Sequence, residues 1–249
     1  MRLDSYVFTS AGGREHNEDA AAKREFSSPA PAGGIYVVAD GLGGHQYGER
    51  ASACAVETLT AAEAPAAEED GEAWLRAQLE TANTRILAQQ RETQAVMKST
   101  AVVLLIRGER AEWANVGDSR LYYLHGRELT GVTEDHSVAY KKYKAGEISR
   151  DMIGTDEDQS SLLRALGNPE RHEPSFYSSA APLSPGDGFL LCSDGVWEYL
   201  PDGEILIDFL KAGNARQWAE LLLLRVISRV QPGNDNLSLI TVMVGGDPD

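Results

Sequence analysis

The sequence predicts an α+β fold whose strands are antiparallel. Apolar runs typical of strands follow one another along the chain and are separated by short turns, as at Glu109-Arg110 and Gly126. Amphipathic helical patterns, with apolar residues three or four positions apart, lie between these groups of strands. The length of 249 residues suits one large domain or two small ones, and it is enough to bury a sizeable core.

Apolar runs mark the expected strands. They cover residues 3–10, 35–39, 99–107, 111–116, 121–124, 128–129, 176–177, 189–192 and 237–244. In the first run, Tyr6 and Phe8 alternate with polar neighbours. Residues 35–39 are all apolar, which indicates a short buried strand that ends in an acid and a cluster of glycines. We expect residues 185–188, which contain proline and glycine, to join the strands on either side of them.

Four stretches have helical patterns. They lie at 47–59, 74–86, 205–210 and 218–230. Residues 133–137 look like a helix start with an acid-rich first turn. The segment 146–161 is polar and poorly periodic, so we expect a mobile surface segment there. Residues 27–34 and 61–71 read as loops by composition, the second without a domain boundary.

Composition excludes some classes of function. The net charge of -15 argues against binding of nucleic acid, whose phosphates it would repel, and is compatible with hard cations or protein partners. No apolar run approaches the ~18 residues of a transmembrane helix. The first residues have no signal-peptide pattern. Cys54 and Cys192 sit in apolar contexts without metal-type spacing, so we expect reduced core residues of a cytoplasmic protein.

Three expected strands run into an acid beside a glycine. The acids are Asp40, Asp118 and Asp194, and a fourth acid, Asp235, comes just before the last strand. In an antiparallel sheet the end of one strand lies beside the start of its neighbour. Asp40, Asp194 and Asp235 can therefore meet at one edge, and Asp118 could join them.

A cluster of carboxylates calls for a cation, because like charges would otherwise force some of them to stay protonated. Oxygen ligands suit Mg²⁺ or Mn²⁺, and the lack of soft ligands argues against structural zinc. Each acid alone would more simply be a turn or cap residue. The threefold repetition of the strand-acid-glycine pattern favours the metal site.

Arg14 adds a second kind of chemistry. It lies four residues before Glu18 and five before Asp19. A guanidinium is the preferred bidentate partner of a phosphate, so an arginine beside metal-binding acids suggests phosphoryl chemistry. Taken alone, Arg14 would be a salt-bridge partner of Glu15 or Glu18.

Other catalytic motifs are missing from the sequence. Gly41 to Gly44 is not a phosphate-binding Walker loop, because no Gly-Lys-Ser/Thr follows, and Ser193 sits in no Gly-x-Ser-x-Gly elbow. We expect structural or capping roles for His45 and His136.

Six motifs in order resemble a known family. They are Arg14-Glu15-His16-Asn17-Glu18-Asp19, Val38-Ala39-Asp40-Gly41-Leu42-Gly43-Gly44-His45, Gly117-Asp118-Ser119-Arg120, Thr133-Glu134-Asp135-His136-Ser137, Ser193-Asp194-Gly195 and Asn234-Asp235-Asn236. This series resembles the metal-dependent protein serine/threonine phosphatases of the PP2C (PPM) type in their bacterial form. The resemblance implies an α-β-β-α sandwich of two antiparallel sheets flanked by helices. It also implies a single domain over 1–249, with a flap beside the active site at about 139–161.

The resemblance assigns roles to the acids. It implies that Asp40 bridges two ions, Mn²⁺ or Mg²⁺, and that Asp194 and Asp235 complete the first site. The Gly41 carbonyl and waters would serve the second site, with Glu18 acting through water.

Three further assignments follow from the resemblance. Asp19 is a possible supporting acid. Asp118 matches the acid that, with Asp194, holds a third and weaker ion in bacterial members. Arg14 matches the arginine that binds the phosphate.

The resemblance further implies hydrolysis of phosphoserine and phosphothreonine in proteins by attack of a metal-bridging water, in opposition to a bacterial Ser/Thr kinase. We expect a monomer. Some family members have a histidine after the Asp-Gly pair as proton donor, but this chain has Leu42, so the general acid stays unassigned. Lysines and acids in the flap could select substrates, or could form a solvated surface. Two alternatives are an inactive phosphoprotein-binding protein and a two-metal hydrolase of small phosphoesters or nucleotides.

Overall fold

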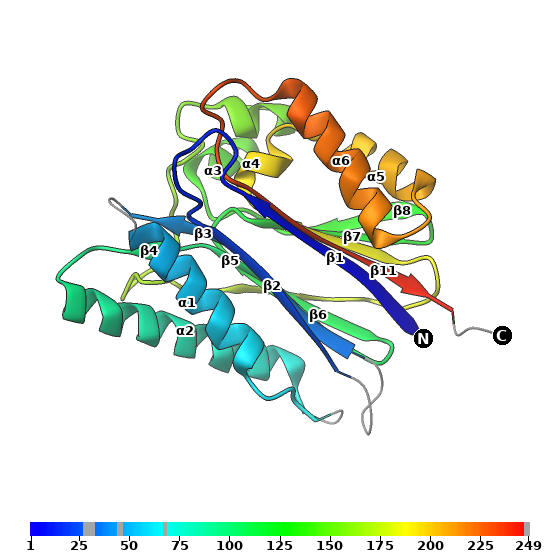
Figure 1. The fold of residues 1–249 in the computed structure, drawn as a ribbon, viewed down its shortest axis with the longest axis horizontal. Coiled ribbons are helices and arrows are strands. Elements are labelled where there is room, and N and C mark those ends of the chain that lie inside the picture. The colour runs from blue at the N-terminus through cyan, green and yellow to red at the C-terminus, as the bar shows by residue number, and fades with distance from the viewer. Residues whose placement is uncertain (27–32, 44–46, 67–68, 247–249) are drawn as a thin grey trace.

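Two antiparallel β-sheets lie face to face, with helices on the outer face of each (Figure 1). The computed structural model describes residues 1–26, 33–43, 47–66 and 69–246. Most of the expected loop at 27–34, as well as His45, lies outside this described part. The α-β-β-α arrangement implied by the sequence motifs is confirmed.

The first sheet has the strand order β1-β11-β10-β7-β8. Its strands are β1 (Arg2–Ser10), β7 (Arg120–His125), β8 (Glu128–Val132), β10 (Gly188–Cys192) and β11 (Leu237–Gly245). The N- and C-terminal strands are neighbours, with Arg2 opposite Gly245 and Ser10 opposite Leu237. β11 also pairs with β10, which brings the start of the last strand beside the end of β10.

The second sheet has the order β2-β3-β5-β6-β9, and β4 pairs with the end of β3. Its strands are β2 (Asp19–Phe26), β3 (Gly33–Leu42), β4 (Lys98–Ser99), β5 (Ala101–Arg107), β6 (Arg110–Val116) and β9 (Ser175–Ser178). β3 lies between β2 and β5 and is almost wholly buried, as its apolar run predicts.

Helices cover the two outer faces. They are α1 (Tyr47–Ala61), α2 (Gly71–Thr93), α3 (Val138–Lys144), α4 (Asp194–Trp197), α5 (Asp202–Lys211) and α6 (Ala215–Arg229), together with the 3-10 helix η1 (Arg150–Thr155). α1 and α2 lie over the second sheet, whereas α5 and α6 lie over the first (Figure 1). None of the helices in the described ranges is long and apolar enough to cross a membrane.

Three apolar clusters hold the four layers together. One packs α1 and α2 on the second sheet, with Leu59 and Leu79 fully or almost fully buried. Another packs the α4–α6 helices on the first sheet around Trp218. The third lies between the sheets and contains Val38, Leu104 and other strand residues. Each layer therefore buries one face on its neighbour, as stacked sheets and helices require.

Several elements differ from the sequence-based expectation. Strand β2 is unexpected because its apolar residues, apart from Phe26 at its end, are alanines, which have low strand propensity, yet Ala21 packs between the sheets. Asp194 and Gly195, which the sequence predicts at the end of a strand, are instead the first residues of the short helix α4. Residues 185–188 connect strands of different sheets, since β9 pairs with β6 and β10 pairs with β7 and β11.

The flap segment contains more regular structure than its polar sequence indicates. Ser137 caps α3 by accepting a hydrogen bond from the Tyr140 backbone N–H, and Ile153 of η1 is buried. Lys142 forms ion pairs of 2.9 Å with Asp156 and 2.8 Å with Asp158. The expected acidic run therefore neutralises one of the flap lysines.

Candidate metal centre

Asp40 lies within β3, not in a turn after it. The strand continues through Gly41 and Leu42, which pair with Ser99 and Lys98 of β4, so the expected strand end at residue 39 is wrong. Thr100 fixes the Asp40 backbone, because its Oγ1 accepts from Asp40 N at 2.9 Å and its N–H donates to Asp40 O at 2.8 Å. The carboxylate therefore projects from a rigid strand.

Gly41 is required by close backbone contacts. Its N–H donates to the Glu18 carbonyl at 3.0 Å. A Cβ at this position would lie 2.1 Å from the carbonyl oxygen of Gly48 in α1. The absence of a side chain lets α1 and the Glu18 segment close around the end of β3.

Asp194 and Asp235 are brought together by the pairing of β10 with β11. Asp194 is the first residue of α4, directly after Ser193, and its Oδ1 accepts a 2.7 Å hydrogen bond from Gly195 N. Asp235 lies just before β11, and its Oδ1 accepts from Asn236 N at 2.8 Å. The charge of Asp194 is the largest effect on the Asp40 pKa after burial, so these two carboxyl groups also lie near each other. The sequence correctly predicts that these acids meet at one end of the sheets.

Asp118 joins the cluster from the end of β6. It is 5 % exposed and follows Gly117, whose φ of +97° favours glycine. The charge of Asp194 is the largest effect on the Asp118 pKa after burial, which places the two carboxylates close together.

Asp19 and Glu18 flank the cluster on β2 and the turn before it. Asp19 is opposite Asp40 in the β2–β3 register and accepts a 2.7 Å hydrogen bond from Ser193 Oγ. Burial, together with the charges of Asp194 and Asp235, raises the Asp19 pKa to about 7. Burial and the charge of Asp235 also raise the pKa of Glu18.

The cluster disfavours its own negative charge. Burial, followed by the charge of Asp194, raises the pKa values of Asp40 and Asp118 well above the usual carboxyl range. Burial and the charge of Asp235 raise the pKa of Asp194 to about 6. Among the described residues, no lysine or arginine side chain forms an ion pair with Asp40, Asp118 or Asp194.

An oxygen-only donor set of this kind fits a hard divalent cation, which would stabilise the ionised carboxylates. In the described part of the chain, however, no group of three or more His, Cys, Asp or Glu side chains forms a ready set of metal ligands. Asp235 instead pairs with Arg14. Assembly of the site would require Asp235 to move from this pair.

Arg14 lies on the rim of the cluster. Its Nη2 is 2.9 Å from Asp235 Oδ2, and the two side chains are 55 % and 47 % exposed. An open cavity of about 580 Å³ lies here, lined by Arg14, Glu15, His16, Glu18, Gly43, Asp235 and Asn236. The cavity is large enough to admit a phosphoryl group beside the acids.

Asn236 holds the loop that carries Arg14. Its Nδ2 donates to the carbonyls of Ala11 at 3.0 Å and His16 at 2.9 Å, and its Oδ1 accepts from Glu18 N at 2.7 Å. The sequence-based reasoning did not assign this role, although Asn236 flanks Asp235 in a quoted motif. The supporting role of Thr100 has no local sequence signal.

Neither His136 nor Leu42 is suited to act as the general acid. His136 Nδ1 accepts a 3.2 Å hydrogen bond from Gly117 N, which agrees with its expected structural role. Burial and the charge of Arg164 lower the His136 pKa to about 4. Leu42 carries no titratable group, so the general acid remains unassigned.

Comparisons with known proteins give the family. Residues 12–220 match the family described as protein phosphatase 2C. The serine/threonine phosphatase stp of Listeria welshimeri is 34% identical over 236 residues, which cover 92% of this chain and 90% of that protein.

Solved structures agree with this match. The serine/threonine phosphatase Stp1 of Staphylococcus aureus has a TM-score of 0.86 and 27% identity, covering 99% of this chain and 96% of that chain. The catalytic domain of the phosphatase PstP, solved with two manganese ions, has a TM-score of 0.81 and 28% identity, covering 98% and 99% of the two chains. The chain therefore belongs to the protein phosphatase 2C family.

Proposed function

We propose that this protein phosphatase hydrolyses phosphoserine and phosphothreonine in proteins with the help of divalent cations bound by the acidic cluster. The observation that carries the proposal is the convergence of Asp40, Asp118 and Asp194, which form no ion pair with a lysine or arginine of the described residues, beside Arg14 on an open rim. Clustered oxygen donors supply a cation site, and the guanidinium supplies a phosphate site.

For the ligand roles we propose those that the resemblance to the family implies. Asp40, at the centre of the cluster, would bridge two cations. Asp194 and Asp235 would hold the first cation, and the Gly41 carbonyl would face the second. Glu18 would act through water.

Two buried acids complete the assignment. Asp118 would hold a third, weaker cation together with Asp194. Asp19 would support Asp40 from the neighbouring strand, because Ser193 Oγ fixes its carboxylate.

The cations are Mn²⁺ or Mg²⁺ in this proposal, which the two manganese ions of the PstP domain support. When bound, they would lower the pKa of water and offset negative charge on the phosphoryl group. Arg14 would bind the phosphate after it separates from Asp235. A cation on Asp235 would compete with the 2.9 Å ion pair, and the released guanidinium could then donate two hydrogen bonds to the phosphate.

Turnover by four proteins tests the proposal: wild type, Asp40→Asn, Asp194→Asn and the control Asp187→Asn. Asp187 is a buried acid, 1 % exposed, but it lies at the opposite end of β10, where it contacts His125. With Mn²⁺ and a phosphothreonine peptide, the two cluster variants should lose about a thousandfold in kcat/KM. Asp187→Asn should stay within about threefold of wild type, after correction for any unfolded fraction by circular dichroism.

The substrate panel separates the alternatives. Higher kcat/KM on phosphoserine and phosphothreonine peptides than on nucleotides and p-nitrophenyl phosphate supports a protein phosphatase. The reverse order would indicate a hydrolase of small phosphoesters. Phosphopeptide binding without turnover that EDTA abolishes would indicate an inactive binding protein and would overturn the proposal.

The broader assignments are also proposals. We infer one PP2C-like domain over 1–249 with its flap at about 139–161, a monomeric state, and phosphoproteins made by a Ser/Thr kinase as substrates. Cys54 and Cys192 are both buried and free, which supports a cytoplasmic location.

A further inference from the structure

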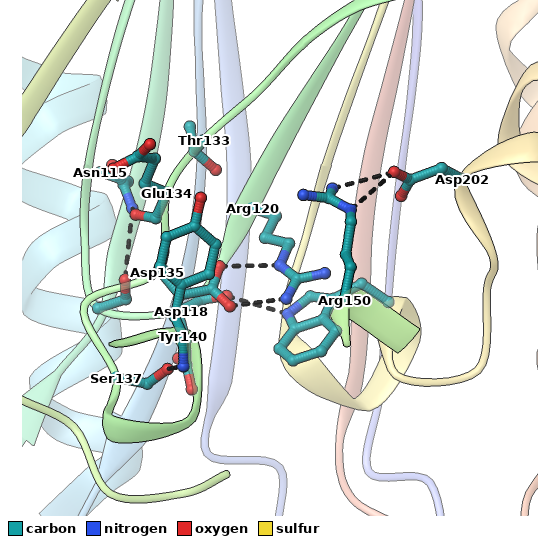
Figure 2. Close-up of polar contacts among 12 residues, drawn as sticks. Asn115, Asp118, Arg120, Thr133, Glu134, Asp135, Ser137, Tyr140, Arg150 and Asp202 are labelled. Carbon is teal, nitrogen blue, oxygen red and sulfur yellow. Dashed lines mark hydrogen bonds and ion pairs between the residues drawn. The ribbon is translucent and has the colours of Figure 1, made fainter. Parts of the chain in front are cut away.

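A buried arginine side chain, that of Arg120, lies near the acidic cluster. Arg120, the first residue of β7, is 6 % exposed. Its Nε and Nη2 donate to the two carboxylate oxygens of Asp135 at 2.8 Å and 2.6 Å, and Figure 2 shows the two residues with Arg150 nearby. A bidentate pair of this kind fixes the plane of the guanidinium.

Trp197 connects this arginine to the cluster. The guanidinium carbon of Arg120 lies 3.5 Å from the centre of the Trp197 ring, as in a cation–π contact. The Trp197 indole Nε1–H donates a 2.9 Å hydrogen bond to the backbone carbonyl of Asp118. Trp197 is also the last residue of α4, whose first residue is Asp194. One short helix therefore carries one acid of the cluster and clamps the backbone of another.

The flap also packs against the indole. A Cβ added to Gly154 of η1 would lie 3.3 Å from Trp197 Cζ3, so the glycine backbone passes close to the ring. His136, next to Asp135, donates from its backbone N–H to the carbonyl of Gly117 at 2.9 Å. The indole is thus held by Arg120 and by the flap, and it has little freedom to rotate.

The position that Trp197 clamps needs a restraint. Asp118 follows Gly117, and glycine permits more backbone conformations than any other residue. His136 holds the Gly117 N–H and carbonyl, and the indole holds the carbonyl of Asp118. Without the indole hydrogen bond, the peptide after Asp118 could rotate and turn the Asp118 carboxylate away from Asp194. The clamp therefore acts on the direction of a carboxylate that it does not touch.

We propose that Trp197, held by Arg120, is a positioning residue that directs the Asp118 carboxylate toward Asp194 and so sets the affinity of the weakest cation site. The inference rests on the proposed role of Asp118 as a cation ligand. It concerns the contact between Trp197 and the Asp118 backbone, and it predicts an effect on one cation site out of those that the cluster forms.

Cation binding tests this proposal without reference to activity. Trp197→Phe keeps an aromatic ring on Arg120 but removes the N–H donor. In calorimetric Mg²⁺ titrations, the weakest phase should lose about threefold to tenfold in affinity, the effect of one lost hydrogen bond, and the tighter phases should not change. Asp118→Asn should abolish the same phase. Trp113→Phe, which changes an indole on β6, is the matched control and should leave all phases intact.

A spectroscopic readout follows the clamp itself. The wild-type protein has four tryptophans, and its ¹⁵N–¹H spectrum should contain one indole cross-peak for each. The Trp197 cross-peak, assigned in the wild-type protein, should shift during Mg²⁺ titration with the midpoint of the weakest phase. It should not show that phase in Asp118→Asn.

The outcomes are decisive in each direction. Wild-type affinity of the weakest phase in a folded Trp197→Phe protein overturns the proposal. If that variant does not fold, Arg120→Lys, which cannot form the bidentate pair, and the indole titration decide in its place. If the Trp197 cross-peak does not shift with the weakest phase, the proposed effect of Trp197 on that cation site is also refuted. If the wild-type protein shows neither the tight binding phases nor turnover, the proposed function is contradicted instead. The two failures are therefore distinguishable.

Discussion

The Arg14 guanidinium holds Asp235 by a 2.9 Å ion pair at the mouth of the acidic cluster. Both side chains are about half exposed, so water screens the pair and its contribution to folding is small. The same exposure leaves the guanidinium accessible to a phosphate. The pair therefore belongs to the binding surface more than to the stability of the fold.

Replacement of Arg14 should separate function from stability. Arg14→Ala should change the free energy of unfolding by less than about 0.5 kcal/mol. It should lower kcat/KM for a phosphopeptide by about tenfold to a hundredfold, the effect of losing charge-assisted hydrogen bonds to the phosphate. Arg76→Ala, which removes an equally exposed 2.9 Å pair with Glu72 on α2, is the control and should keep full activity. Equal losses in the two variants would argue against a phosphate-binding role for Arg14.

Repulsion among the acids predicts an inverted stability effect for Asp40→Asn. In EDTA the variant should melt at the same temperature as wild type or higher, because it removes one charge from a cluster that burial and Asp194 already destabilise. With Mn²⁺ at a hundred times its dissociation constant, wild type should gain about 2.7 kcal/mol of stability per bound ion, and the variant should gain less. Thermal unfolding with and without Mn²⁺ measures both effects. A variant that is less stable than wild type in EDTA would contradict the repulsion argument.

The pH dependence of stability without cations follows from the same carboxyl groups. Asp194 and Asp19 have folded-state pKa values raised to about 6 and about 7, above the value of about 3.9 in an unfolded chain. Between about pH 4 and pH 7 these two carboxyl groups bind more protons in the folded state than in the unfolded state, so they lower the free energy of unfolding as pH rises. His136, whose pKa is lowered to about 4, opposes this trend as a single group. Carboxyl groups with a lowered pKa, such as that of Asp156 beside Lys142, titrate below this window.

The measurement is the melting temperature in EDTA at about pH 5 and about pH 7.5. Wild type should melt at a lower temperature at the higher pH, and Asp194→Asn should show a weaker dependence because one of the raised groups is gone. Saturating Mg²⁺ should weaken the dependence in wild type, since a cation stabilises the ionised carboxylates. A wild-type melting temperature in EDTA that rises between these two pH values would refute the assignment of the raised pKa values.

Sequence reasoning located the acids well because their signal is local. Asp118 and Asp194 each lie beside a glycine where a strand ends. Antiparallel pairing of β10 with β11 brings Asp235 beside Asp194, whereas Asp40 and Asp118 come from the other sheet of the sandwich. The exact context of Asp40 was not predictable, because its strand continues only through pairing with β4, fifty-eight positions further on at Lys98. Strand β2 was not predicted, for a related reason. Its alanines are strand residues only because β3 lies beside them.

The supporting contacts could not be predicted from local patterns. Trp197 contacts Asp118, and Asn236 contacts Ala11 and His16, through backbone carbonyls whose positions depend on the whole fold. A carbonyl leaves no mark on the sequence, since every residue has one. The acids of the candidate site were therefore visible in the sequence, whereas the residues that orient them were not.

Gly41 should tolerate no side chain. In Gly41→Ala the new Cβ would meet the Gly48 carbonyl oxygen at 2.1 Å, so β3 and α1 must separate. We expect about 1–3 kcal/mol of destabilisation, as for other overpacked sites, and weaker Mn²⁺ binding from a displaced Asp40. Gly203→Ala in α5 is the matched control, because nothing lies within 4 Å of its added Cβ, and it should be neutral or slightly stabilising. Chemical denaturation and calorimetry measure the two effects, and equal stability of the two variants would contradict the contact.

Asn236 should govern the placement of Arg14. Asn236→Ala removes three hydrogen bonds that tie Ala11, His16 and Glu18 together, so the Arg14 loop loses its anchor. We expect about 1–3 kcal/mol of destabilisation, since partners of the lost amide stay partly buried. KM for a phosphopeptide should also rise more than kcat falls, because the loop positions the phosphate-binding side chain. Asn234→Ala is the control, since the one side-chain hydrogen bond of Asn234 to a described residue goes to the carbonyl of the adjacent Asp235. If both variants alter KM equally, the anchoring role of Asn236 is wrong.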